Sequence, residues 1–262
     1  MPFAERAGHR IHYQVSGPDT APPLLLIMGL ALSSRAWDTL PARLATRFRV
    51  IVFDNRGTGR SGRSGWAFRM RDLADDAAAV LDALAIPRAH VFGVSMGGMV
   101  AQELALRHPA RVDRLALGAT FAGWLHSRKP GLRTQLDLLL LNLGRVTEKR
   151  VAEVLVSPEW HAQHPRGAIE WIVRADATTL RFALAQIAAV ARHATARRLG
   201  TIRAPTLVIT GDQDRLMPPR NSEVLARLIP GAKLVLLKGA GHAFPLERED
   251  ETVAALEQHF LG

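Results

Sequence analysis

The sequence predicts a protein of the α/β class, with a mostly parallel sheet flanked by helices. Short, continuously apolar runs, which suit strands buried on both faces, alternate with helix-length segments along most of the chain. Such alternation is typical of parallel strands joined by right-handed crossovers. The 262 residues are 48% hydrophobic and 22% charged, which supports a large core and excludes a disordered chain. With no cysteine, disulfides, thiol nucleophiles and thiolate metal sites are excluded.

The expected strands and helices follow from these runs in chain order. Residues 9–15 alternate between polar and apolar types, which is typical of an antiparallel hairpin near the N-terminus. Six further strands are expected at 24–28, 49–53, 89–94, 113–117, 206–210 and 233–237. Helices are expected at 69–84, 96–108, 222–229 and 249–260.

One long segment interrupts this alternation. Residues 122–199 contain no convincing strand, only helical stretches rich in Leu, Ala and Arg and broken by Pro130, Pro158 and Pro165. An insertion of this size between two strands of one sheet has to cover the carboxyl edge of that sheet. We therefore expect a core of residues 1–121 and 200–262, with a helical cap at 122–199 inserted after the sixth strand.

The charge of the chain is strongly positive but evenly spread. Lys and Arg number 34 against 24 Asp and Glu, for a net charge of +10. No nucleic-acid-binding module accompanies the arginines, so we expect a solvated Arg-rich surface rather than a nucleic-acid partner. The N-terminus lacks the apolar stretch of a secretory signal, and no apolar run approaches the ~18 residues of a membrane span. We expect a soluble, cytoplasmic protein that binds no membrane; its oligomeric state has no signal in the sequence.

The segment Gly93-Val94-Ser95-Met96-Gly97 lies between a buried strand and a helix. G-x-S-x-G in this context is typical of a nucleophile elbow, a tight turn that lifts the serine hydroxyl above the sheet. Glycines two residues before and after the serine are needed, because side chains there would strike the neighbouring strand or helix. Ser95 is the candidate nucleophile. The amide of Met96 is the first candidate donor to an oxyanion.

Candidates for the base and the acid follow two later strands. A serine hydroxyl needs a base, and the base needs an orienting acid. Gly241-His242 follows the last expected strand, and Gly211-Asp212-Gln213-Asp214 follows the one before it. We assign His242 as the base and Asp214 as the acid. Asp212 is the weaker candidate, because a side chain directly after Gly211 more often fixes the turn.

The loop after the strand at 24–28 provides the second oxyanion donor. Gly29 lets the backbone turn toward Ser95, and the amide of Leu30 is assigned as the donor. We also expect Gly29 beside the substrate.

Apolar residues of the expected cap are candidates to line an acyl or aromatic pocket, although most of them suit the cap's own core as well. These residues are Trp124, Leu125, Leu139, Leu140, Trp160, Trp171 and Phe182. Three arginines could meet a substrate carboxylate or remain solvated, namely Arg128, Arg133 and Arg174.

Together these segments resemble the α/β-hydrolase superfamily over essentially the whole chain. The matching pieces are 26–30, 54–61, the elbow at Ser95, 211–214 and 241–242, and the order Ser, Asp, His is the family's order. The sequence is most similar to small capped carboxylesterases, with a likeness to enol-lactonases and antibiotic-ester methylesterases. The resemblance implies an eight-stranded sheet, a cap, and cofactor-free serine hydrolysis of a small-molecule ester or lactone. The family's strand-end loop usually reads His-Gly, whereas Met28 replaces the histidine here.

Other functions remain open within and outside this superfamily. C–C bond hydrolases and cofactor-free perhydrolases use the same three residues, so the fold cannot choose among them. A non-catalytic member that only binds a small ligand is the alternative from another class. Dehalogenase and epoxide hydrolase chemistry is disfavoured, because Ser95 stands where those enzymes carry an aspartate.

Two further motifs suggest a cofactor or a metal, and neither is favoured. Residues 57–62 form a literal G-x-G-x-x-G after a strand, but a helix becomes plausible only near Arg69, too late to meet a pyrophosphate. His161 and His164 lack a neighbouring carboxylate that would complete a metal site. We therefore expect no cofactor and no metal.

Overall fold

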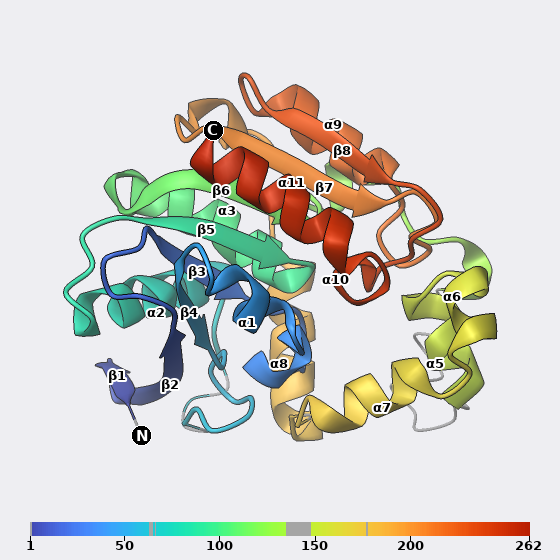
Figure 1. Cartoon of the computed structure of the whole chain (residues 1–262), viewed down its shortest axis with the longest axis horizontal. Helices are drawn as coiled ribbons and strands as arrows, with labels where there is room; N and C mark the ends of the chain where they lie inside the picture. The colour runs from blue at the N-terminus through green and yellow to red at the C-terminus, as the bar shows by residue number, and fades with distance from the viewer. Residues whose placement is uncertain (1, 63–64, 66, 135–147, 177) are drawn as a thin grey trace.

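An eight-stranded sheet forms the centre of the protein (Figure 1). The computed structural model describes residues 2–62, 65, 67–134, 148–176 and 178–262. The strands are β1 Phe3–Arg6, β2 His9–Ser16, β3 Pro23–Ile27, β4 Arg49–Phe53, β5 Ala89–Val94, β6 Val112–Gly118, β7 Thr206–Gly211 and β8 Lys233–Leu237. Their spatial order is β1-β2-β4-β3-β5-β6-β7-β8, and only the β1–β2 and β2–β4 pairs are antiparallel. The predicted mostly parallel sheet and N-terminal hairpin are confirmed.

Helices cover both faces of the sheet. One face carries α2 Met70–Ala83, α3 Met96–Arg107 and α9 Arg220–Leu228, and the other carries α1 Leu40–Leu44, α10 Phe244–Glu247 and α11 Glu249–Leu261. The apolar run of β3 is continuous because Leu25 and Ile27 pack into the first core while Leu24 and Leu26 pack into the second. Within the described residues, no helix combines the length and the apolar character needed to cross a membrane.

The last strand departs from the expectation of burial on both faces. β8 lies at the edge of the sheet, where the side chains of Leu234 and Leu236 are 37% and 47% exposed. An edge strand has a neighbouring strand on one side only. Its apolar run therefore predicts burial less well than the runs of β3 to β7.

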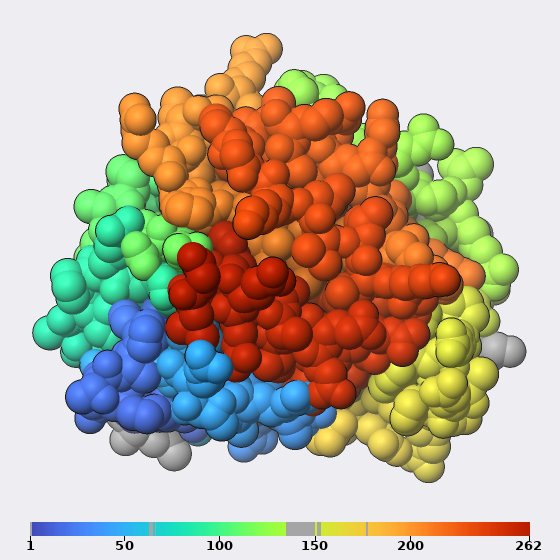
Figure 2. All heavy atoms as spheres, turned by 45° about the horizontal axis from the view of Figure 1, so that its top comes forward, coloured from blue at the N-terminus to red at the C-terminus, as the bar shows by residue number. Residues whose placement is uncertain are grey.

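Between β6 and β7 the described chain is helical. The helices are α5 Glu148–Leu155, α6 Pro158–Gln163, α7 Gly167–Arg174 and α8 Leu180–Ala191. Figure 1 shows α5, α6 and α7 beyond the arrowheads of β5 and β7, at the carboxyl edge of the sheet. In the space-filling view, the red C-terminal segment lies between the blue N-terminal segment and these yellow helices (Figure 2).

The two ends of this helical segment meet at the core. The amides of Thr195 and Ala196 both donate to the carbonyl of Ala122, and Gly123 forms an isolated bridge with Ala194. The chain therefore leaves and re-enters the core at one place, as an insertion would. Helix α8 nevertheless shares the core of α2 and α3, so the division at 122–199 stays a prediction.

Candidate active site

Ser95 lies on a strained turn between β5 and α3. Its backbone has φ 57° and ψ −121°, and α3 begins at the next residue, Met96. Positive φ is uncommon for a residue with a Cβ and persists only where the surroundings enforce it. A Cβ at Gly93 would overlap the carbonyl oxygen of Gly97, and one at Gly97 would overlap that of Ile27. The glycine requirement expected for a nucleophile elbow is therefore present in the structure.

Asp214 and His242 are in direct contact. His242 Nδ1 lies 2.8 Å from Asp214 Oδ2, and both side chains are buried. Because an ionised carboxylate only accepts, Nδ1–H is the donor, and Nε2 becomes the ring nitrogen that can take a proton. The other carboxylate oxygen accepts the amides of Leu216 at 2.9 Å and Met217 at 2.7 Å. Asp214 is thus held in place by its own loop and orients the imidazole.

The competing carboxylate has a different role. Asp212 is exposed, and its Oδ1 accepts the amide of Gly239 at 2.7 Å. This bond ties the loop after β7 to the loop after β8. Asp212 therefore fixes turns, as its position directly after Gly211 suggested, and Asp214 is the partner of His242.

The loop after β3 lies against Ser95. A Cβ built at Gly29 would stand 3.2 Å from Ser95 Cβ and 3.7 Å from its Oγ. A Cβ here would be closer than most real Cβ contacts, so glycine lets the loop lie against Ser95 without displacing it. Leu30 follows within the same loop and also lines the cavity at Ser95.

Two side chains that sequence reasoning missed brace this loop. Asn55 donates its amide to the carbonyl of Met28 at 3.0 Å, and the amide of Ala31 donates to Gln186 Oε1 at 2.7 Å. Both side chains are buried, so the loop has polar braces although Met28 replaces the family's histidine. Asn55 stands in the 54–61 segment that carried the family resemblance, so its motif was a usable signal. Gln186 lies in α8, far away in sequence, and had none.

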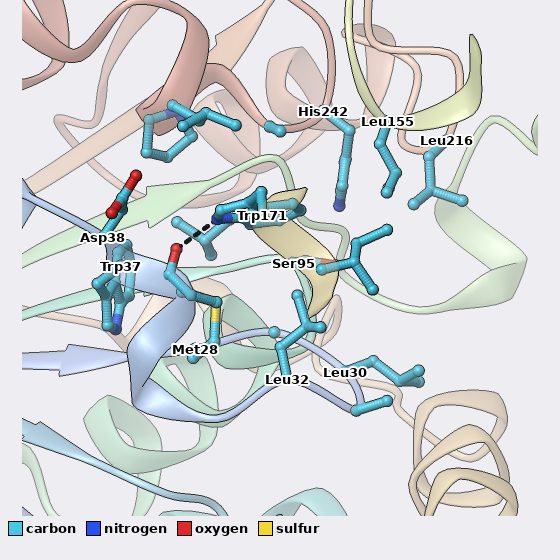
Figure 3. A pocket seen from close by; sticks show the side chains of 18 of the residues that line it. Met28, Leu30, Leu32, Trp37, Asp38, Ser95, Leu155, Trp171, Leu216 and His242 are labelled. Atoms are coloured by element: carbon cyan, nitrogen blue, oxygen red, sulfur yellow. Dashed lines mark hydrogen bonds between the residues drawn. The ribbon is translucent and has the colours of Figure 1, made fainter. Parts of the chain in front are cut away.

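A cavity of about 430 Å³ opens between the sheet edge and the helices, and both Ser95 and His242 line it. Figure 3 shows the imidazole of His242 directed toward Ser95. Most of the remaining lining is apolar and comes from strand-end loops and helices alike, including Met28, Leu30, Leu32, Trp37, Val154, Leu155, Ile169, Trp171, Ile172, Leu216 and Leu246. Charged groups also reach it at Asp38, Arg150 and Glu249.

Several of the proposed substrate-binding residues lie elsewhere. Trp124 and Leu125 are 41% and 95% exposed on a short turn, and Trp160 stacks on His164 at 4.5 Å between ring centres. None of these three lines the cavity at Ser95, so their role in binding substrate stays a prediction. Trp124 and Leu125 face solvent, whereas Trp160 is half-buried and packs against the second core. Leu139 and Leu140 lie outside the described residues.

Among the described members of the predicted set, Gly29 and Trp171 line the cavity. The indole N–H of Trp171 donates to the carbonyl of Ala36 at 2.7 Å, which anchors α7 to the core (Figure 3). Phe182 instead packs over Gly57, in the core shared by α8.

The three arginines named for a substrate carboxylate do not line the cavity. Arg174 Nη2 lies 3.7 Å from Asp38 Oδ2, and Arg133 Nη2 lies 3.0 Å from Glu153 Oε2. The backbone of Arg128 bonds to Asn221 in both directions. Of the described Lys and Arg residues, Arg150 lines the cavity instead.

The described residues show the surroundings of the two remaining motifs. Asp54 accepts the amides of Ser34 and Arg60, which folds the 57–62 segment as a braced loop, and α2 begins only at Met70. In the part of the chain that the structure describes, no three metal-type side chains gather at one point.

A parallel sheet whose strand-end loops carry a serine elbow and a joined Asp–His pair defines the class of α/β hydrolases. The chain belongs to the α/β hydrolase fold family: that family's model matches residues 22–249. It is an enzyme of this superfamily.

Similar proteins carry several hydrolytic activities in their names. A RutD protein of Azorhizobium caulinodans, named for carbamate hydrolysis, is 32% identical over 93% of this chain and 92% of its own. The rhodomycin D methylesterase DauP of a Streptomyces species is 32% identical over 90% of each chain. The enol-lactonase of Burkholderia xenovorans superimposes with a TM-score of 0.87 over the whole of both chains, at 26% identity.

Proposed function

We propose that the protein is a serine hydrolase that cleaves a carboxylic ester or lactone of a small molecule through an acyl-enzyme on Ser95. The observation that carries the proposal is the 2.8 Å contact between Asp214 and His242, beside a cavity that Ser95 also lines. A hydroxyl, an imidazole and a carboxylate in series are the parts of a serine nucleophile and its base.

In the first step, Ser95 Oγ attacks the carbonyl carbon while His242 Nε2 takes the hydroxyl proton. Asp214 holds the imidazole in the required tautomer and stabilises its charge. The amides of Leu30 and Met96 donate to the developing oxyanion, and the N-terminus of α3 adds favourable potential there. His242 then returns the proton to the leaving alcohol, and the C–O bond breaks.

In the second step, water repeats the attack on the acyl-enzyme, with His242 again as the base. Ser95 leaves with the proton, and the carboxylic acid product departs. For a lactone, the acid and the alcohol are parts of one molecule, so the product of both steps is a hydroxy acid.

The lining of the cavity supports an apolar acyl or aromatic substrate. Its walls are largely Leu, Ile, Val, Met and Trp side chains, and about 430 Å³ accommodates more than an acetyl group. Carbamate hydrolysis is the second candidate, because several relatives that are about a third identical are named for it. A free carbamate is small and polar and would leave these walls hydrated, which favours the ester.

The test is activity and covalent labelling of Ser95→Ala beside the wild type. We expect a fluorophosphonate to label the wild type and not the variant, with hydrolysis reduced by about 10⁴-fold or more and thermal unfolding unchanged. Ser16→Ala, at an exposed position at the end of β2, is the matched control and should behave as wild type. Near-normal hydrolysis by Ser95→Ala would refute the assignment, and an unlabelled wild type would favour a protein that only binds its ligand.

A substrate panel separates the chemistries that share this mechanism. It comprises p-nitrophenyl esters of increasing chain length, lactones, and a carbamate. We expect kcat/KM to rise from the acetyl ester to a medium-chain ester, as the apolar walls become filled. Turnover of the carbamate alone would replace the ester proposal with the second candidate.

A further inference from the structure

A buried carboxylate joins the junction between α5 and α6 to the loop that carries His242. Glu247, at the end of α10, is 8% exposed. Its Oε1 accepts the amide of Gly241 at 2.9 Å, and its Oε2 accepts the amide of Ser157 at 2.8 Å. Gly241 directly precedes His242, and Ser157 is the N-cap of α6. One side chain thus bonds two segments that lie far apart in sequence.

The same two segments are in contact along their backbones. The amide of Ala243 donates to the carbonyl of Leu155 at 2.8 Å. A Cβ at Gly241 would come within 2.7 Å of the Val156 carbonyl carbon and 2.8 Å of the Ser157 nitrogen, so only glycine fits there. Leu155 lines the cavity from one side of this junction, and His242 lines it from the other. A shift of one segment therefore displaces both the pocket wall and the imidazole.

Burying a carboxylate at such a junction costs desolvation free energy. Burial raises the pKa of Glu247, although the bonds from Ser157 and Gly241 and the charge of Arg248 lower it in part. A buried carboxylate costs desolvation free energy unless hydrogen-bond donors compensate for it. What a carboxylate provides is two acceptor oxygens on one rigid plane, which hold two amides at a set separation.

We infer that Glu247 is a positioning residue that holds residues 155–157 and the His242 loop together as one unit. Its consequence for catalysis rests on the proposed function, because it assumes that His242 is the base. The unit itself does not depend on that assumption. Loss of Glu247 separates the two segments, which lowers kcat through the base and raises KM for substrates long enough to touch Leu155.

The first arm of the test measures the unit without using catalysis. Hydrogen exchange at the amides of Ser157 and Gly241 is followed in wild type, Glu247→Gln and Glu251→Gln. Gln offers one acceptor oxygen and one donor, so at least one of the two amides loses its partner and exchanges about tenfold faster. Glu251 is exposed on α11, and its variant makes the same charge change with no expected effect. Unchanged exchange of both amides in Glu247→Gln would overturn the inference.

A second pair of variants breaks the junction from the other side and leaves Glu247 intact. Ser157 has φ −68° and ψ 152°, which proline adopts readily, so Ser157→Pro removes the donating N–H with little change in backbone angles. Ser157→Ala keeps that N–H and removes the hydroxyl, which caps α6 and also interacts with Glu247. We expect exchange at Gly241 to be faster in the Pro variant than in the Ala variant. Equal behaviour of the two would overturn the inference even if Glu247→Gln failed to fold.

The second arm measures catalysis with a short and a medium-chain ester, at a temperature where every variant is folded. We expect Glu247→Gln and Ser157→Pro to lower kcat several-fold on both esters and to raise KM on the longer one only. A purely structural role would lower thermal stability and leave both constants unchanged. If wild type neither hydrolyses nor labels, the proposed function fails, and the exchange arm alone decides whether the unit exists.

Discussion

We expect His193 to make the stability of this protein depend on pH. It lies where the helical segment returns to the core, is 4% exposed, and its Nε2 stands 3.3 Å from Gln102 Oε1. Burial lowers its pKa from 6.5 to about 4, and the charge of Arg198 acts in the same direction. The folded protein therefore keeps this imidazole neutral in a pH range where the unfolded chain protonates it. As the pH falls through this range, the unfolded state gains protons, and the folded state loses stability.

The magnitude follows from the two pKa values. They differ by about 2.5, and each unit corresponds to about 1.4 kcal/mol, so protonation removes about 3 kcal/mol of unfolding free energy by pH 4. About 2 kcal/mol of this is lost between pH 8 and pH 5. His193→Gln keeps a polar group near Gln102 and cannot titrate. We expect the unfolding free energy of the variant to fall by about 2 kcal/mol less than that of wild type over this range.

Urea unfolding at a series of pH values measures this difference directly. His259 has its pKa lowered to about 4 as well, but it titrates in both proteins and cancels in the comparison. His126→Gln, at an exposed position, is the matched control and should follow the wild-type curve. Parallel curves for wild type and His193→Gln between pH 8 and pH 5 would refute the account of His193.

Two further predictions concern the catalytic loops. Asp214→Asn keeps the shape of the carboxylate but presents a donor or a neutral oxygen to His242 Nδ1. We expect kcat to fall by about 10³–10⁴-fold with little change in KM. A loss of kcat below tenfold would contradict the orienting role of Asp214. Gly29→Ala brings a methyl group to 3.2 Å from Ser95 Cβ, so we expect kcat/KM to fall by about 10²-fold and fluorophosphonate labelling to slow in parallel. Labelling at the wild-type rate would show that the loop moves aside without displacing Ser95.

The sequence by itself predicted the sheet and the local geometry of the elbow. Strands such as 49–53 and 89–94 were found at their observed bounds, because burial on both faces requires an uninterrupted apolar run. The elbow at Ser95 is readable because its backbone angles impose glycines at fixed spacing. The choice of Asp214 over Asp212 as the partner of His242 also followed from position within one loop. These features are local, so a short stretch of sequence carries them.

The lining of the cavity and the supports of its loops were decided only by the tertiary structure. Composition marked Trp124 and Trp171 alike as apolar residues of the helical segment, but only packing determines that Trp171 faces the cavity while Trp124 faces solvent. Gln186 bonds to Ala31 and Glu247 bonds to Ser157, and each of these partners is far away along the chain and follows no periodic pattern. Hydrophobic periodicity predicts which face of an element is buried. It does not predict which distant backbone group a polar side chain of that element will bond. That pairing depends on how all the elements pack together.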